Sequence, residues 1–445
     1  MAARDSRIGF VSKTTSADVI VIGAGVIGAS IAFELSRTGR KVICVDKGGA
    51  AGAGSTSASS AIIRFTYSNH NTILMAWESA FFWFDWQNYI GVQDPDGMAK
   101  FIKTGYIVFL TEGYDGVKVR ELWDEFDIPY EILSAAQIRE RFPALDPGKF
   151  FPPKRIDDPA FGDDPYDELA AMYDPLSGFI DDPMLATHNF AHAAKNHGAE
   201  FRFHEEVGEI HRENNKVTGV TLLSGDRINA PIVVNAAGPH ASKINLMAGI
   251  AAEMKVRHRP LRQEVFSPAA PVGFRLQDGA PIVADLDIGQ YFRPHMGDTL
   301  NVGATEPACD PLDWIEDADD WKQETTVEIW ETAMLRLARR MPDFGIPLKP
   351  LGIAALYDAT DDWIPLYDKS SLGGFFMACG TSGNQFKNSP LVGQFMRALI
   401  DAAAAGQDHD KDPVQFIGAH TGRAIDLAAF SRLRTQAVTA GNVMG

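Results

Sequence analysis

The chain has 445 residues, of which 45% are apolar and 22% charged, so it is a globular protein long enough for two or three domains. Its net charge of −17 at pH 7 disfavours nucleic acid and anionic membrane surfaces as partners. No long apolar run predicts a membrane span, and none in residues 1–16 predicts a signal peptide. Three scattered cysteines, Cys44, Cys309 and Cys379, argue against a disulfide framework, and we therefore expect a cytoplasmic location.

Residues 17–47 carry the clearest chemical signal in the chain. An apolar, β-branched run at 19–22 is typical of a strand buried on both faces of a parallel sheet. Directly after it, Gly23, Gly25 and Gly28 form a G-x-G-x-x-G pattern that precedes a predicted helix over 29–37. The first glycine permits a tight turn, the second lets the backbone approach a pyrophosphate, and the third lets the helix pack closely on the strand. The helix N-terminus would then receive the phosphates.

A second apolar run, at 42–45, ends at Asp46, 23 residues after Gly23. A carboxylate in this place accepts hydrogen bonds from a ribose hydroxyl. Strand, glycine turn, helix, strand and acid together predict a dinucleotide site rather than a phosphate-free βαβ unit. Because the residue is an acid and not an arginine, FAD or NAD is favoured over NADP.

A tract of small residues at 47–64 follows this unit and ends at Arg64. It predicts a loop whose backbone passes close to a ligand. The aromatic residues in a predicted helix over 71–89 have spacings typical of core packing. Further along, the sequence predicts a strand-rich region at 257–307 and a helix over 321–341.

Two segments could be mistaken for metal sites. The acidic stretch at 156–174 lacks the ligand spacing of an EF-hand, so we interpret it as a surface insertion. In a predicted helix over 183–198, His188 and His192 lie four residues apart on one face. A zinc site would need further ligands, and the sequence offers none on that face. No metal is therefore expected.

Two later strands also end where backbone should pass close to a ligand. A run at 227–234 leads into NAAGPHAS at 235–242. Another run, at 375–378, is followed by two glycines and a helix that begins near Ser389 or Pro390. A second helix N-terminus therefore points at the ligand of the first. The tail, 406–445, is charged and then basic.

These motifs together resemble the FAD-dependent amine and amino-acid oxidoreductases of the D-amino-acid oxidase superfamily. The resemblance rests on the dinucleotide unit, on NAAGPHA at 235–241 and on GTSGNQFKNSPLVG at 380–393, and it covers roughly residues 17–400. Within the family, the likeness is strongest to monomeric sarcosine oxidase and dimethylglycine dehydrogenase. Sarcosine oxidase has an arginine after a serine-rich loop in an R-I-I-R-x-x-Y context, which reads A-I-I-R-F-T-Y at 61–67 here.

The resemblance implies an α/β fold with a Rossmann-like FAD-binding domain that is discontinuous in sequence. That domain would comprise 17–88, 176–246 and 352–404. A second, mixed-sheet substrate domain of α+β type would comprise 89–175 and 247–351, and 405–445 would form a C-terminal tail.

FAD is the cofactor that the resemblance implies. Sarcosine oxidase attaches its flavin through a cysteine at the position of Ala355, so we expect FAD to be held non-covalently, with Cys379 as the alternative attachment point. The residues expected to bind FAD are Gly23, Gly25, Val26, Ile27, Gly28, Asp46, Lys47, Ser55, Ser59, Val207, Ala237, Gly238, Gly380, Gly383, Asn384, Phe386 and Lys387.

The resemblance also implies a substrate site. Arg64 and Lys387 would clasp the substrate carboxylate, because two cations in one cleft need an anion between them. Tyr291 and Tyr357 match the substrate-site tyrosines of the family. The alternative interpretations are that Arg64 and Lys387 are unrelated surface cations, and that the two tyrosines are core residues or hydrogen-bonded residues of strands.

The expected reaction is FAD-dependent oxidation of a secondary or tertiary amino acid of the N-methyl type, a small carboxylate-bearing amine. Hydride transfer to flavin N5 would give an imine that water hydrolyses. The alternatives are oxidation of a D-amino acid or 2-hydroxy acid on the same scaffold, and a non-catalytic flavin-binding subunit that docks through its tail.

The electron acceptor is either oxygen or an electron-transfer protein or quinone. Asn301 stands where sarcosine oxidase has a lysine that promotes the reaction of reduced flavin with oxygen. Loss of that cation favours a dehydrogenase over an oxidase, although Arg293 could supply the charge.

Overall fold

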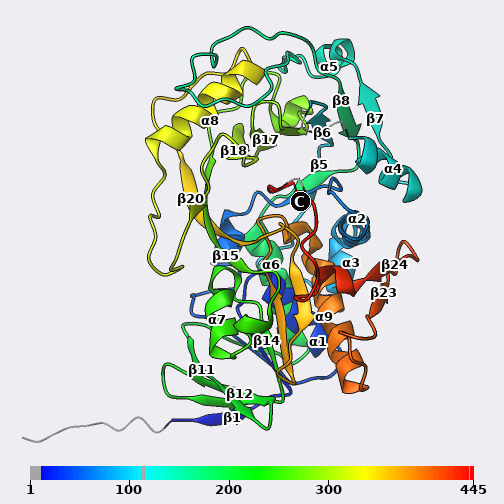
Figure 1. The fold of residues 1–445 in the computed structure, drawn as a ribbon, viewed down its shortest axis with the longest axis vertical. Helices are drawn as coiled ribbons and strands as arrows, with labels where there is room; N and C mark the ends of the chain where they lie inside the picture. Colours follow the sequence, from blue (N-terminus) through cyan, green and yellow to red (C-terminus); the bar gives the residue numbers. More distant parts are fainter. Residues whose placement is uncertain (1–11, 113, 115, 440, 445) are drawn as a thin grey trace, which may run out of the picture.

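The computed structural model describes residues 12–112, 114, 116–439 and 441–444. The first sheet is six-stranded, in the order β10-β3-β2-β14-β22-β21 (Figure 1). All neighbours in it are parallel except β21 and β22. Its strands are β10 (Glu200–Arg202), β3 (Val42–Val45), β2 (Val19–Ile22), β14 (Ile232–Asn235), β22 (Phe375–Cys379) and β21 (Leu366–Lys369). The Rossmann-like α/β fold is therefore confirmed, with strands drawn from distant parts of the chain.

The dinucleotide unit is the centre of this sheet. Its helix α1 (Val26–Ser36) starts three residues earlier than predicted, directly at the glycine turn, and all its residues are buried. Helices α6 (Pro183–Asn196) and α9 (Ser389–Ala404) pack on α1. Alternate residues of β2 face opposite layers, as the period of a strand requires. Val19 and Val21 belong to the core under the helices, and Ile20 and Ile22 to the core on the other face.

A four-stranded sheet and a short helix cover that other face. The sheet has the order β1-β13-β12-β11, and the helix is α7 (Ala241–Met247). Its strands are β1 (Thr14–Ser16), β13 (Arg227–Asn229), β12 (Lys216–Leu222) and β11 (Val207–Glu213). Helices, central sheet and small sheet thus form three layers, seen in the lower half of Figure 1.

A nine-stranded mixed sheet forms the upper half of the molecule (Figure 1). Its order is β19-β15-β18-β17-β16-β6-β8-β7, and β20 also pairs with β15. Helix α8 (Val327–Arg340) packs on β17 and β18, and a small sheet of β4 (Ile62–Ile63), β9 (Gly178–Ile180) and β5 (Phe101–Lys103) is separate from it. The nine strands are β19 (Asp313–Trp314), β15 (His258–Phe266), β18 (Thr299–Ala304), β17 (Gln290–His295), β16 (Ile282–Asp285), β6 (Tyr106–Phe109), β8 (Ala171–Asp174), β7 (Glu131–Leu133) and β20 (Gly352–Thr360). Short helices α4 (Val117–Glu125) and α5 (Ala135–Arg141) flank β7 in the sequence.

Two predicted helices differ from the structure. The helix expected over 71–89 is two helices, α2 (His70–Phe84) and α3 (Trp86–Ile90), because Asp85 leaves helical geometry at φ −123°. The helix expected from 321 begins only at Val327. The Arg262 side chain donates to the backbone carbonyls of Lys322 and Glu324 at 2.7 and 2.6 Å, so these carbonyls cannot begin a helical ladder.

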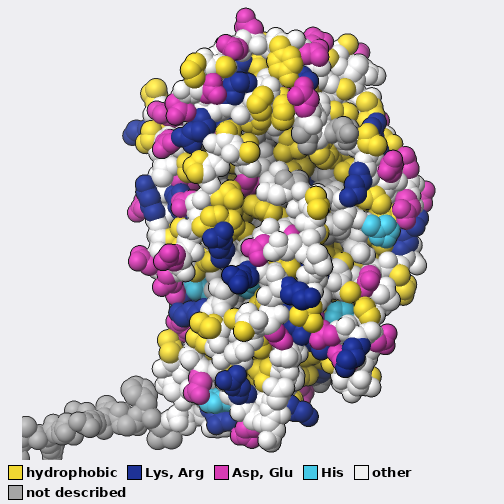
Figure 2. Space-filling model, in the orientation of Figure 1, with side chains coloured by type: hydrophobic (Ala, Val, Ile, Leu, Met, Phe, Trp, Pro, Cys, Tyr) yellow, Lys and Arg dark blue, Asp and Glu magenta, His cyan; other side chains and the backbone are white. Residues whose placement is uncertain are grey.

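The tail packs along the six-stranded sheet rather than extending from it. After a hairpin of β23 (Gln415–Ile417) and β24 (Ala424–Asp426), Arg432 pairs with the buried Asp368 at 3.0 Å and Arg434 with Asp362 at 2.7 Å. The chain then runs to Val443 and Met444, which are buried near the middle of the molecule (Figure 1). On the face of the molecule shown in Figure 2, acidic and basic side chains are interspersed. Within the described part of the chain, no helix combines the length and apolarity needed to cross a membrane.

Candidate active site

One cavity of about 840 Å³ connects the glycine turn with Arg64 and Tyr106. Its lining comes from both large sheets and from the tail. All the predicted cofactor residues line it except Gly28 and Gly380. Among the predicted catalytic residues, Arg64, Lys387, Tyr291 and Tyr357 line it, whereas Asn301 does not. One elongated site therefore contains most of what the sequence predicted.

The N-terminus of α1 forms one end of the cavity. The helix begins after Gly25, which has no side chain to cap it, and its first residues, Val26 and Ile27, line the cavity. Gly28 does not line the cavity because its role is packing: a Cβ on it would lie 1.8 Å from the backbone oxygen of Gly23. Asp46 accepts hydrogen bonds from the amides of Ala24 and Gly48, both at 2.6 Å, which fixes its carboxylate beside the turn.

Two buried cations converge at the other end. Arg64 is 6% exposed and Lys387 is 4% exposed. The Arg64 guanidinium lies 4.9 Å from the centre of the Tyr67 ring, and the Lys387 ammonium lies 5.0 Å from it. Burial, and then the charge of Arg64, lower the pKa of Lys387 well below its usual range. Burial likewise raises the pKa of Tyr67 to about 12, so its phenol stays neutral.

Neutral groups, and no carboxylate among the described residues, satisfy these two cations. Lys387 Nζ donates to Tyr67 Oη at 2.9 Å and to the backbone oxygen of Asn384 at 2.7 Å. Arg64 donates to the backbone and hydroxyl oxygens of Thr66 and, through the other side of the guanidinium, to the carbonyl of Val443 at 2.8 Å. Two basic side chains that are buried without a carboxylate partner among the described residues form a receptor for an anion, and the charge of that anion would favour the protonated form of Lys387.

The predicted tyrosines lie on the wall of this end. Burial raises the pKa values of both Tyr291 and Tyr357, so both phenols are protonated donors at neutral pH. Tyr291 Oη lies 2.9 Å from Ser60 Oγ, which donates to Asn301 Oδ1 at 2.8 Å. Asn301 therefore lies behind Ser60 and holds it, one layer away from the cavity.

Arg293 is adjacent to Asn301 across the β17–β18 ladder and is 2% exposed. Its Nε donates to the backbone oxygen of Ser60 at 2.9 Å, and its guanidinium lies 3.9 Å from the centre of the Phe179 ring. Burial lowers the pKa of Arg293 to about 9, which still leaves it charged at neutral pH. This cation also lies behind Ser60 rather than on the cavity wall.

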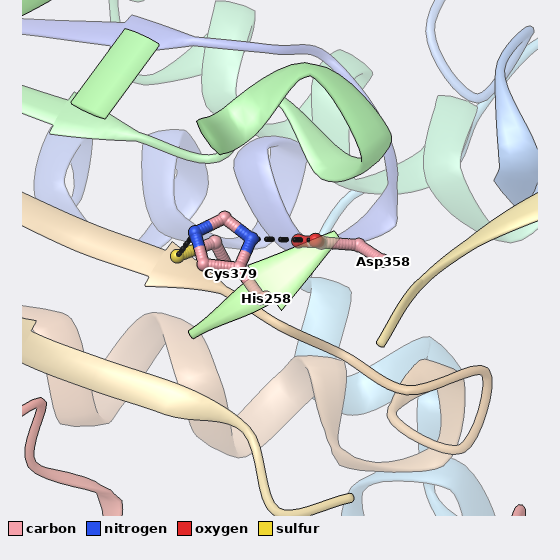
Figure 3. Close-up of side chains that lie close together, drawn as sticks. All are labelled: His258, Asp358 and Cys379. Carbon is pink, nitrogen blue, oxygen red and sulfur yellow. Dashed lines mark hydrogen bonds and ion pairs between the residues drawn. The ribbon is translucent and has the colours of Figure 1, made fainter. Parts of the chain in front are cut away.

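A buried chain of three side chains supports the turn at 380–383. His258 lies between Asp358 and Cys379, with one ring nitrogen toward each (Figure 3). Its Nδ1 is 2.6 Å from Asp358 Oδ1 and its Nε2 is 3.6 Å from Cys379 Sγ. Burial alone would lower the pKa of His258, but the charge of Asp358 raises it well above its usual range. Two different nitrogens serve the two partners, so the arrangement is a hydrogen-bonded chain rather than a chelate.

Asp358 connects these hydrogen-bonded side chains to the turn at 380–383. Its Oδ2 accepts from the amide of Gly380 at 2.6 Å, and its backbone oxygen accepts from the amide of Ser382 at 2.8 Å. Gly380 thus contributes to the turn from behind the cavity wall. Cys379 is fully buried against His258 and does not line the cavity, whereas Ala355 does.

Several residues at the site were not predicted from the sequence. Thr56 accepts from the amide of Val26 at 3.1 Å beside the glycine turn. Tyr67 contacts both cations, and in the sequence it stands out only as the last residue of A-I-I-R-F-T-Y at 61–67. Val443 lines the cavity, and Glu306 lies behind it and accepts from its amide at 2.9 Å; no local pattern in the sequence marks either residue.

Known proteins that are similar to this chain identify its family. The chain matches the family model described as FAD dependent oxidoreductase over residues 18–399. It is 25% identical over 431 residues to FAD-dependent oxidoreductase domain-containing protein 1 of Xenopus laevis, covering 86% of this chain and 79% of that protein. It is 24% identical over 394 residues to sarcosine oxidase subunit beta of an Arthrobacter species, covering 85% of each.

Among solved structures, L-proline dehydrogenase from P. horikoshii superposes with a TM-score of 0.72 at 24% identity. The match covers 89% of this chain and 95% of that one, and it shows the fold. The glycine turn, the uncapped helix N-terminus and the fixed Asp46 carboxylate fit FAD, which the family uses as its cofactor. The chain belongs to the family of FAD-dependent oxidoreductases.

Proposed function

We propose that the protein oxidises a secondary or tertiary amino acid of the N-methyl type. The observation that carries the proposal is the pair Arg64 and Lys387, two buried cations without a carboxylate partner among the described residues, at the end of the FAD cavity away from Asp46. A substrate carboxylate there would neutralise both charges. Sarcosine oxidase subunit beta, a relative over most of its length, acts by its name on an amine of this class.

The bound FAD supplies the hydride acceptor for such an oxidation. This chain's own residues bind and orient the substrate. Arg64 and Lys387 would hold the carboxylate, which fixes the neighbouring C–H bond relative to the cofactor end of the cavity. Tyr291 and Tyr357 would donate to the substrate from the wall. Tyr106 and Met444, both buried, would exclude water while the C–H bond is broken.

For the electron acceptor, we favour a protein or quinone over oxygen. The asparagine at position 301 carries no charge, and its amide oxygen is engaged by Ser60. Arg293 is the nearest alternative cation in the ladder, but its guanidinium is turned to Ser60, Pro294 and Phe179. Neither would stabilise a superoxide anion that forms in the cavity.

The proposal is tested by anaerobic bleaching of the flavin absorbance in the purified holoenzyme. The panel comprises sarcosine, N,N-dimethylglycine, L-proline, D-alanine and glycolate. Bleaching by the N-methyl amino acids is expected, whereas faster bleaching by D-alanine or glycolate would transfer the assignment to those substrate classes.

The variant Arg64→Gln keeps a polar side chain that can donate a hydrogen bond but removes the charge. It should retain FAD and lose flavin reduction by about 100-fold or more, since a buried charged hydrogen-bond partner is removed. Arg257, which is exposed, provides the control Arg257→Gln, which should react as the wild type does. If Arg64→Gln reduces its flavin at the wild-type rate, the carboxylate clasp is wrong. If no substrate bleaches the wild type, the chain is a flavin-binding subunit.

A further inference from the structure

The backbone of Val443 lies in the anion-binding end of the cavity. Its amide N–H donates to Glu306 Oε2 at 2.9 Å. Its carbonyl accepts from Arg64 at 2.8 Å and from Asn384 Nδ2 at 3.3 Å. Upstream, the tail is held by Arg434 on Asp362 and by Thr439 Oγ1, which donates to the backbone oxygen of Asp362 at 3.0 Å. The tail is thus anchored outside the cavity, and Val443 reaches into it.

The order of groups in this segment is that of an α-amino acid. A nitrogen with a hydrogen, one carbon atom and a carbonyl follow one another in Val443, and the first and last of them contact Glu306 and Arg64. A free amino acid offers the same sequence of groups, with an ammonium in place of the amide and a carboxylate in place of the carbonyl. Both ends would carry a full charge opposite to that of their partner.

We propose that Val443 occupies the place of the substrate and that Glu306 is the receptor for the substrate amine. This inference rests on the proposed function, because it takes Arg64 as the receptor for the substrate carboxylate. The substrate displaces Val443 and takes over both of its partners. Glu306 then determines specificity for an amine at the α-carbon.

Glu306 has the capacity that this role needs. It lies just beyond β18, and its Oε1 is shielded from solvent and has no hydrogen-bond partner among the described residues. A backbone amide supplies one hydrogen, whereas the protonated amine of a secondary amino acid supplies two. Such an amine would therefore satisfy both oxygens of Glu306. Burial raises the pKa of Glu306 to about 8, so the carboxyl group is largely protonated at pH 7 while Val443 fills the site. A bound ammonium group would favour the ionised carboxylate, which can then take the amine proton before oxidation.

The proton transfer balances within the site. The N–H bond of the ammonium breaks, its electron pair stays on nitrogen, and the proton forms an O–H bond on Glu306. The amine becomes neutral and the carboxyl becomes neutral, so no net charge is added to the buried cavity. A neutral amine is the form from which a hydride leaves readily.

Because a ligand has to displace Val443, the site should favour ligands that bind Arg64 and Glu306 more strongly than Val443 does. A carboxylate binds a guanidinium more strongly than a neutral carbonyl does, and an ammonium binds a carboxylate more strongly than an amide N–H does. An amino acid therefore improves both contacts that it replaces. A 2-hydroxy acid or an ether acid improves only the contact with Arg64, so the site should prefer amino acids to these analogues.

The test compares sarcosine with methoxyacetate, in which an ether oxygen replaces the amine. Dissociation constants are measured anaerobically on the FAD-loaded full chain, from flavin absorbance changes for methoxyacetate and from the concentration dependence of flavin reduction for sarcosine. The wild type should bind sarcosine more tightly than methoxyacetate. Glu306→Gln should weaken sarcosine at least about tenfold and change methoxyacetate less than about twofold, since only sarcosine loses a charged partner.

Glu316→Gln is the matched control, because Glu316 is exposed and the same charge is removed. It should leave both constants unchanged. Equal effects of Glu306→Gln on the two ligands, or no effect on either, would overturn the role of Glu306. If Glu306→Gln gives either of these results but methoxyacetate binding still requires Arg64, the proposed carboxylate site stands and only the role of Glu306 is overturned. If the wild type binds neither ligand, both fall.

A variant that ends after Thr439 tests the displacement separately and does not alter Glu306. Without Val443, no ligand has to compete for Arg64, so methoxyacetate should bind about tenfold more tightly, an advantage typical of removing a competing conformation. Unchanged or weaker binding would show that Val443 does not compete with the ligand.

Discussion

The role proposed for Lys387 in substrate binding opposes its contribution to stability. The ammonium is buried, and both its burial and the charge of Arg64 lower its pKa well below the usual range. Its two acceptors do not depend on it, because Tyr67 Oη also donates to the backbone oxygen of Asn384, at 2.7 Å. Removal of the ammonium therefore leaves both acceptors with a partner.

We predict that Lys387→Met stabilises the FAD-free protein by about 1 kcal/mol at pH 7, because an unpaired buried charge is removed. The folded-state pKa is lowered, so the wild type is penalised wherever an unfolded lysine would be protonated. The gain should shrink as the pH rises toward about 10, where the unfolded lysine also loses its proton. Urea unfolding at pH 7 and pH 9.5 measures this.

The same variant should bind methoxyacetate at least about tenfold more weakly, since a charged hydrogen bond to the carboxylate is lost. Stability and affinity would then change in opposite directions, as expected for a binding residue. A variant that is destabilised and still binds methoxyacetate normally would show that Lys387 is a structural residue.

At the scale of single residues, the sequence predicted those parts of the site that stand next to a recognisable turn. Gly23, Asp46, Arg64 and Lys387 belong to motifs with fixed spacing, and all four line the cavity. Val443 reaches Arg64 across a sequence separation of 379 residues, and nothing in its own neighbourhood indicates this. Asn301 lies in the region predicted to be rich in strands, but its position behind Ser60 follows only from the register of β17 and β18.

At the scale of elements, α1 depends on a close contact that a single methyl group would disrupt. A Cβ on Gly28, inside α1, would lie 1.8 Å from the backbone oxygen of Gly23, which lies in the turn directly after β2. We predict that Gly28→Ala lowers the free energy of unfolding by about 3 kcal/mol, at the upper end of overpacking effects, and abolishes FAD retention, because it displaces Gly23, which lines the cavity. Thermal unfolding and the flavin content of the purified protein measure the two effects.

Gly162→Ala is the control for this prediction. A Cβ on Gly162 would meet no atom within 4 Å, so stability and flavin content should match the wild type. If Gly28→Ala purifies with full flavin content and an unchanged melting temperature, the turn is more adaptable than its geometry indicates.

Elements with strong local patterns were predicted, and those set by distant contacts were not. The β2–α1–β3 unit and the start of α9 at Ser389 follow from apolar runs, glycines and a proline. The first residues of the helix expected over 321–341 are instead held by Arg262, which stands on β15 in a different part of the chain. Sheet order could be predicted only through the resemblance to a known family, because strand pairing joins segments that lie far apart in sequence.

At the scale of the whole molecule, the FAD cavity is lined by segments that lie far apart in the sequence. The cavity is lined by the turn after β2, the loop at 55–60, the start of β11 and the turn at 383–387. Removal of FAD should therefore lower the melting temperature of the full chain. Readdition should restore it, with about 1.4 kcal/mol of stability for each tenfold excess of free FAD over its dissociation constant.

Denaturation should also release all of the flavin into solution, because Ala355 offers no thiol and Cys379 is buried against His258. Absorbance of the supernatant and of the precipitate after acid treatment distinguishes free from attached flavin. Flavin that remains with the precipitated protein would contradict non-covalent binding.

The choice of electron acceptor is also a property of the assembled molecule, because it depends on which charges surround the reduced cofactor. Asn301 is neutral, and the charged guanidinium of Arg293 lies behind Ser60 rather than on the cavity wall. We predict that substrate-reduced enzyme is reoxidised in air-saturated buffer at least about 100-fold more slowly than by a soluble quinone, since oxygen reduction requires a cation near the forming superoxide. Stopped-flow recovery of the flavin absorbance measures both rates. Reoxidation in air at the rate seen with quinone would identify an oxidase. The variant Arg293→Gln would then show whether this buried guanidinium supplies the charge. If it does, its loss should slow the reaction with oxygen and leave the reaction with quinone unchanged.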